Sequence, residues 1–99
     1  MFEVYILFSD KLEKYYIGFT SNLEERFTFH LNDHQSRKYT YKADDWRIVF
    51  TIPCSSKNQA MLVEKHIKSM KSKTYIENLM KYPAISEKLK QKYERASDY

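Results

Sequence analysis

The sequence has few of the residues that interrupt or cross-link a chain. Among 99 residues there are one glycine, two prolines and one cysteine, Cys54. A lone cysteine forms no internal disulfide and no thiolate pair for a structural metal, which is typical of a reducing compartment. No apolar run approaches the ~20 residues of a membrane-spanning helix, and residues 1–8 lack the basic and small-residue flanks of a signal peptide. We therefore expect a cytoplasmic protein with no membrane contact.

The residues that are present suffice for a folded core. Hydrophobic residues make up 42% of the chain and aromatic residues 16%, with nine tyrosines and six phenylalanines. Disordered chains are poor in these residue types. A chain of this length has enough apolar side chains for one core and not for two, so we expect a single domain.

The positive charge is concentrated in the second half of the chain. Residues 1–55 carry seven basic and eight acidic side chains, whereas residues 56–99 carry ten basic and five acidic ones. The sequence pI is 9.1. A basic half of this kind is typical of a surface that binds nucleic acid, although a solvated, lysine-rich helix face has the same composition.

Hydrophobic periodicity predicts three strands. Residues 3–8 and 15–19 are rich in β-branched and aromatic side chains, and the polar stretch between them lacks an Asn-Gly pair. This pattern predicts a β-hairpin with a turn longer than two residues. Residues 46–52 alternate Trp46, Ile48, Phe50 and Ile52 with other residues, and Pro53 follows. We expect a third strand that stops at this proline.

Four helices are predicted around these strands. The first runs from about Leu23 to Leu31, and its capping box is either Ser21 with Glu24 or Asn22 with Glu25. The element order is therefore β-β-α-β-α-α-α, which predicts an α+β fold with a small three-stranded antiparallel sheet flanked by helices.

The later helices have their own start signals. Ser56 and Gln59 form a capping box for a helix that ends near Lys71. A short helix is expected around residues 76–80, and Pro83 suits the first turn of the last one. We expect residues 1–82 to form the main domain and residues 83–99 to be a helical extension of it.

Several residues together form a pattern that resembles the GIY-YIG nuclease superfamily. The resemblance covers about residues 3–80 and points to small stand-alone members related to the nuclease domain of the excinuclease. Val4 replaces the first glycine of the family's pattern, but the tyrosine after it is retained. The matching residues are Val4, Tyr5, Ile6, Tyr16, Ile17, Gly18, Thr20, Arg26, His30 and Glu64.

The resemblance implies metal-dependent hydrolysis of phosphodiester bonds in DNA. It assigns one Mg²⁺ or Mn²⁺ ion to Glu64 and the scissile phosphate to Arg26, and it places Tyr5, Tyr16 and His30 around the activated water. These residue types suit that chemistry, because carboxylate oxygens are hard ligands for such ions and a guanidinium matches phosphate oxygens. The catalytic residues implied are Tyr5, Tyr16, Arg26, His30 and Glu64.

Further residues are expected to contact the nucleic acid. Gly18 is the only glycine, and within a strand it costs roughly 0.5–1 kcal/mol relative to alanine. A bulge or a strand end would explain it by itself, whereas the resemblance implies that the backbone there comes close to a phosphate. Lysines near Glu64 would contact phosphates without reading the bases. The sequence does not distinguish DNA from RNA. The predicted nucleic-acid contacts are Gly18, Thr20, Lys65, Lys68, Lys71 and Lys73.

Alternative interpretations remain open at this stage. Glu64 and Lys68 are four residues apart, so they also suit an ordinary helix ion pair, and His34 competes with His30 for the histidine role. We expect no attached recognition domain, so the target would be chosen by shape, by a protein partner, or with little selectivity. The alternative functions are a nucleic-acid-binding module of the same fold without turnover, and a protein-interaction domain.

Overall fold

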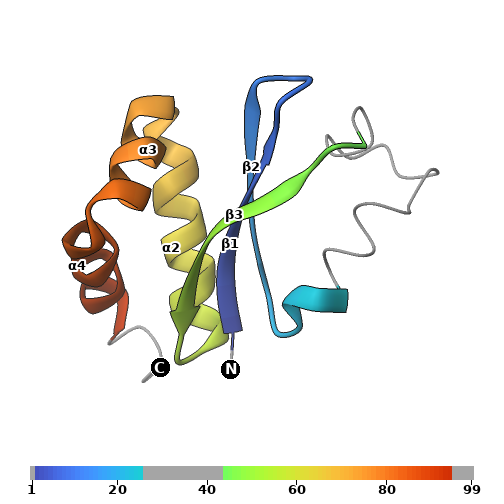
Figure 1. Ribbon diagram of the computed structural model, residues 1–99. Coiled ribbons are helices and arrows are strands. Elements are labelled where there is room, and N and C mark those ends of the chain that lie inside the picture. The colour runs from blue at the N-terminus through green and yellow to red at the C-terminus, as the bar shows by residue number, and fades with distance from the viewer. Residues whose placement is uncertain (1, 26–43, 95–99) are drawn as a thin grey trace.

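The computed structural model describes residues 2–25 and 44–94 (Figure 1). Residues 23–25 are helical, and the remainder of the first predicted helix lies outside the described residues. These elements confirm the predicted α+β class. None of the described helices has both the length and the apolar composition needed to span a bilayer. The labelled elements are β1 (Phe2–Ser9), β2 (Lys14–Thr20), β3 (Arg47–Cys54), α2 (Lys57–Met70), α3 (Lys73–Lys81) and α4 (Pro83–Glu94).

The three strands form one antiparallel sheet in the order β2-β1-β3. The β1–β2 connection spans four residues, 10–13, so the predicted longer turn is confirmed. The predicted end of the third strand is wrong, because β3 continues through Pro53 to Cys54. An edge strand tolerates a proline, since one side of its backbone makes no ladder hydrogen bonds.

A bulge in β3 changes which side chains face which side of the sheet. Ile6 lies opposite Phe50, but Leu7 lies opposite Ile48, so Val49 is an extra residue on β3. An extra residue reverses the alternation of side chains beyond it. Trp46 therefore packs with Tyr5 and Leu7, whereas Ile52 packs in the core on the opposite face. The plain alternation in the sequence had predicted one face for both Trp46 and Ile52.

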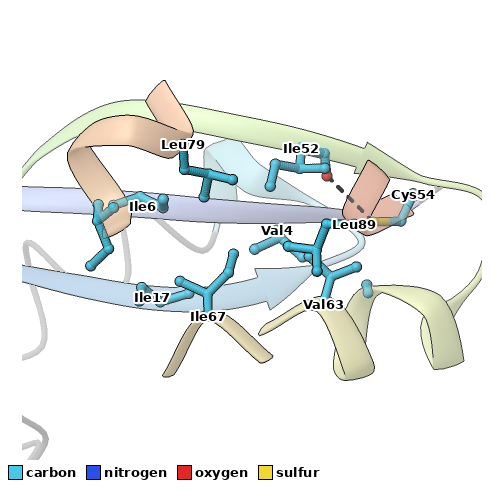
Figure 2. Close-up of a cluster of buried hydrophobic side chains, with 11 residues drawn as sticks. Val4, Ile6, Ile17, Ile52, Cys54, Val63, Ile67, Leu79 and Leu89 are labelled. Atoms are coloured by element: carbon cyan, nitrogen blue, oxygen red, sulfur yellow. Dashed lines mark hydrogen bonds between the residues drawn. The ribbon is translucent and has the colours of Figure 1, made fainter. Parts of the chain in front are cut away.

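The main core lies between the sheet and α2, with α3 and α4 completing it (Figures 1 and 2). Its side chains come from all three strands and all three labelled helices, and most of them are aliphatic. Burying one such side chain stabilises the fold by about 1.5–3 kcal/mol relative to leaving it exposed. The most deeply buried residues of this core are Val4, Ile6, Ile52, Ala60, Val63, Ile67 and Leu79.

Ser56 of the predicted capping box caps the amino end of α2, but the side chain of Gln59 accepts from Ser55 and not from the N–H of Ser56. The hydroxyl of Ser56 accepts a hydrogen bond from the backbone N–H of Gln59 at 3.1 Å. The buried side chain of Gln59 accepts from the backbone N–H of Ser55 at 2.7 Å and donates to the carbonyl of Lys90 at 2.9 Å. The helix ends at Lys71, which adopts a left-handed conformation with φ of 48°. These contacts set the orientation of α2 against the sheet and against α4.

Candidate active site

The two motif tyrosines lie on the face of the sheet that α2 does not cover. Tyr5 lies opposite Gly18 and Tyr16 lies opposite Leu7, so both tyrosines project from the same face. Their ring centroids are 6.4 Å apart with an interplanar angle of 29°. The sequence left this register open, and the structure brings the two side chains together.

Gly18 has a packing reason to be glycine. A Cβ atom at this position would lie 2.6 Å from Cζ and 3.2 Å from Cε1 of Tyr5. Tyr5 is only 1% exposed, so its ring has little room to move aside. The backbone of Gly18 does not adopt a positive φ. Glycine is therefore needed because the Tyr5 ring lies across the neighbouring strand, whereas the predicted approach of Gly18 to a phosphate stays a prediction.

Trp46 also packs against Tyr16. The two rings meet edge to face, with centroids 6.4 Å apart and an angle of 69°, and Trp46 is 3% exposed. An edge-to-face pair of this kind contributes about 0.5–1.5 kcal/mol beyond its buried area. Sequence reasoning assigned Trp46 to a strand and gave it no part in the site. Its position just before the bulged strand β3 is what brings it to the tyrosine face.

Asp45 fixes the segment that carries Trp46. Its carboxylate accepts hydrogen bonds from the hydroxyl of Ser9 at 2.6 Å and from the backbone N–H of Lys11 at 2.9 Å. The buried hydroxyl of Ser9 also accepts from the N–H of Leu12 at 3.1 Å. The hydrogen bond from Ser9 is the main reason why the pKa of Asp45 is lowered. This network ties the start of β3 to the β1–β2 turn.

Glu64 lies on the flank of α2 and pairs with Lys68. The Lys68 Nζ atom is 3.0 Å from Glu64 Oε1, and the side chain of Glu64 is 15% exposed while that of Lys68 is 50% exposed. The same ammonium lies 6.0 Å from the ring centroid of Tyr16, within the range of a cation–π contact. Because β2 is an edge strand, Lys68 can reach around it from α2. Lys68 thus connects Glu64 to the tyrosine face.

Two of the predicted phosphate contacts continue beyond the end of α2 toward the β1–β2 turn. The backbone N–H of Lys71 donates to the carbonyl of Lys68 at 3.2 Å. The ammonium of Lys73 donates to the carbonyl of Glu13 at 2.6 Å and so ties the start of α3 to that turn. Lys65 is exposed on α2, about 100° around the helix from Glu64. Lys68 thus lies at the candidate site and Lys73 at the β1–β2 turn, with Lys71 between them along the chain.

Thr20 and Asn22 form the connection from β2 to the first helix. The Thr20 hydroxyl accepts from the N–H of Asn22 at 3.1 Å and donates to its carbonyl at 3.3 Å. Asn22 accepts from the N–H of Glu25 at 3.1 Å, which identifies the capping box among the two alternatives. Arg26 and His30, the two residues predicted on the helix that follows, lie outside the described residues.

Comparison with known protein families agrees with this arrangement. The fold and the site define a class of protein. It is a small α+β domain in which two tyrosines pair on a sheet and a glutamate lies on the helix that covers the sheet. A family model described as the GIY-YIG catalytic domain matches residues 1–80. The chain therefore belongs to the GIY-YIG family, whose members are nucleases. No curated protein and no solved structure matches the chain.

Glu64 is the candidate metal ligand of this site. Within residues 2–25 and 44–94, no three histidine, cysteine or acidic side chains gather in a way that could hold a metal ion. A single carboxylate nevertheless fits Mg²⁺, which keeps several waters and commonly takes one or two carboxylates plus substrate phosphate oxygens. The Glu64 carboxylate already pairs with the ammonium of Lys68, so a divalent ion would have to displace that ammonium. The residues present are thus compatible with one divalent ion.

Proposed function

We propose that the protein is a divalent-metal-dependent endonuclease that hydrolyses phosphodiester bonds in DNA. Branched or damaged DNA, as in repair or recombination, is the substrate class that we favour. The proposal rests on one observation, that the ammonium of Lys68 contacts both the Glu64 carboxylate and the Tyr16 ring. A nuclease family model also matches residues 1–80 of the chain. A protein partner would supply any further target selection.

In this proposal Glu64 holds one Mg²⁺ or Mn²⁺ ion. When bound, the ion supplies charge compensation at the phosphoryl oxygens and at the leaving alkoxide. Tyr16 would orient the attacking water and accept its proton while its own hydroxyl proton passes to His30, and Tyr5 and Trp46 hold the ring of Tyr16 in place. Arg26 would bind the scissile phosphate and His30 would complete the pocket.

Lys68 has two tasks in the same mechanism. Its ammonium pairs with Glu64 and therefore competes with a divalent cation for that carboxylate. With that carboxylate engaged by an ion, Lys68, whose ammonium lies 6.0 Å from the centroid of the Tyr16 ring, would be available to bind a substrate phosphate.

A nicking assay tests the proposal. Purified wild-type protein is incubated with supercoiled plasmid and with duplex and branched oligonucleotides, with and without Mg²⁺ or Mn²⁺. We expect metal-dependent cleavage that is lost in Glu64→Ala, while Glu77→Ala, the same substitution at an exposed position of α3, retains most of it. Cleavage that persists in a folded Glu64→Ala variant would reject Glu64 as the metal ligand.

A second candidate function is a nucleic-acid-binding module that keeps the fold without turnover. The observation in its favour is the ion pair between Glu64 and Lys68, which is also what a purely structural helix pair looks like. This alternative predicts salt-sensitive binding of oligonucleotides and no nicking at any metal concentration. The same preparations distinguish the two functions.

A further inference from the structure

A concave surface separate from the tyrosine face is lined by residues of α2, α3 and α4. These three helices lie together on one side of the sheet (Figure 1). His66 lies on α2 two residues after Glu64, so at 3.6 residues per turn it is about 200° around the helix from that carboxylate. The pocket is therefore separate from the candidate active site. It has a volume of about 230 Å³ and is lined by His66, Tyr75, Ile85, Lys88, Leu89 and Lys92.

The aromatic rings around this pocket pack against one another. The His66 Nδ1 atom is 3.0 Å from the hydroxyl oxygen of Tyr93. The His66 ring centroid lies 6.2 Å from that of Tyr75 and 5.8 Å from that of Tyr93. Leu89 contributes an aliphatic surface and is 5% exposed. The aromatic and aliphatic surface is thus formed in the free protein and needs no rearrangement to receive a ligand.

The rim of the pocket is basic. Lys88 and Lys92 are exposed and lie four residues apart, which places them on the same face of α4. The ammonium of Lys92 lies 5.5 Å from the centroid of the Tyr93 ring. None of the six lining residues is acidic. The pocket therefore suits a ligand with a flat, apolar part and a negative charge beside it.

The size of the pocket limits the ligand to a small unit. Pockets that bury drug-sized ligands span about 300–1,000 Å³, and this one is smaller. The base of a single nucleotide is small enough to enter and can stack on the aromatic rings, while its sugar and phosphate stay outside and the phosphate pairs with the lysines of the rim. A base inside a duplex is stacked and paired, so only an unpaired base can enter.

We propose that this pocket is a second nucleic-acid subsite that takes one unpaired nucleotide, with the base against His66 and Tyr75 and the phosphate on Lys88 and Lys92. The subsite depends on the proposed function in one respect, the identity of the substrate, which is a DNA with a single-stranded segment. Lys65 lies about midway around α2 between Glu64 and His66 and is exposed. A strand that leaves the candidate active site would cross α2 at Lys65 to reach the pocket.

Titration of the full chain with deoxyadenosine monophosphate, without metal, tests the subsite. The readout is the backbone and side-chain NMR signals of the protein. We expect concentration-dependent shifts at His66, Tyr75 and Leu89 that are larger than those at Tyr16. Absence of shifts at the pocket, or shifts confined to the tyrosine face, would overturn the proposal.

A matched pair of double variants tests the basic rim. In Lys88→Gln/Lys92→Gln we expect the affinity for the nucleotide to fall about tenfold, since two phosphate-pairing charges are lost. Lys57→Gln/Lys81→Gln removes the same charge from other exposed positions and should bind within about twofold of wild type, because neither lysine lines the pocket. Equal losses in the two variants would contradict a localised site.

Two competitors test the ligand class. Inorganic phosphate should bind more weakly than the nucleotide, because it lacks a base to stack. Equal affinity would mean that the rings contribute nothing, which would overturn the proposal. A hexaglutamate peptide that displaces the nucleotide with equal affinity would also overturn it and identify the pocket as a docking site for an acidic protein segment.

These binding experiments are independent of cleavage. Glu64→Ala should bind the nucleotide as wild type does, so binding without any nicking would retain the subsite and reject the proposed function. Conversely, nicking with no nucleotide binding would retain the proposed function and reject the subsite. On cleavable substrates, Lys88→Gln/Lys92→Gln should lose the preference for DNA with a single-stranded flap over blunt duplex.

Discussion

Replacing Gly18 with alanine would place a methyl carbon 2.6 Å from Cζ of Tyr5. Tyr5 is 1% exposed and packs with Leu7 and Trp46, so the clash has to be relieved by shifting packed groups. Overpacking of this kind costs about 1–3 kcal/mol, while replacing a strand glycine with alanine gains about 0.5–1 kcal/mol. The expected net loss in the free energy of unfolding is therefore about 0–2.5 kcal/mol, with a midpoint of about 1 kcal/mol.

Urea unfolding followed by tryptophan fluorescence measures this loss. Trp46 is the only tryptophan in the chain and packs in the same cluster as Tyr5, so its emission reports on the region that the substitution disturbs. In thermal unfolding, each 1 kcal/mol should lower Tm by about 4–8 °C for a domain of this size.

A double-mutant cycle separates the clash from other causes. Tyr5→Leu removes Cζ and the hydroxyl, the atoms that an added methyl group would meet. In the Tyr5→Leu background, Gly18→Ala should be neutral or slightly stabilising, because only the conformational effect of glycine remains. If Gly18→Ala costs the same in both backgrounds, the Tyr5 ring is not the reason for this glycine.

Three further substitutions test other parts of the structure. Tyr16→Phe keeps the ring contacts but removes the hydroxyl, so nicking should fall by about 10²–10⁴-fold, and an unchanged nicking rate would exclude the hydroxyl from the reaction. The pKa of Asp45 is lowered in the folded protein, chiefly by the hydrogen bond from Ser9. The carboxylate therefore stabilises the fold above the unfolded pKa of about 3.9, and this stabilisation is lost as the pH falls through the lower pKa of the folded protein. Asp45→Asn should therefore unfold more easily at neutral pH and show a weaker loss of stability on acidification, and parallel curves for the two proteins would contradict this. Ser56→Ala removes the acceptor for the Gln59 amide and should cost about 1 kcal/mol in urea unfolding without changing the nicking rate, whereas an unchanged midpoint would show that the cap contributes nothing.

Local signals in the sequence predicted the elements well. The capping box at Ser56 depends on residues three apart, and the end of α2 near Lys71 follows the end of its apolar stripe. The long hairpin turn followed from the absence of an Asn-Gly pair. These features are decided within a few residues along the chain, so no knowledge of distant contacts was needed.

Features that depend on pairing between strands could not be predicted. Trp46 and Ile52 fit a plain alternation, and only the bulge at Val49 places them on opposite faces. The reason for Gly18 likewise depends on which residue lies opposite it. A shift of register by one residue exchanges the two faces of a strand, and the sequence pattern alone does not exclude such a shift.

The candidate site was predicted as a set of residue types and not as an arrangement. The resemblance named Tyr5, Tyr16 and Glu64, but nothing in it placed Lys68 between Glu64 and Tyr16. That contact exists because β2 is an edge strand and because α2 packs against β1 and β2. The predicted roles of Arg26 and His30 concern residues outside the described part of the chain and stay predictions.

Nicking of supercoiled plasmid in Mg²⁺ by wild type and Glu64→Ala, at matched concentrations and with both shown to be folded, tests the proposed chemistry directly. We expect nicked plasmid to accumulate with wild type, to disappear when the ion is chelated, and to stay at background with Glu64→Ala. Folded wild-type protein that binds the plasmid but leaves it intact in both Mg²⁺ and Mn²⁺ would contradict the assignment of this site as a nuclease centre.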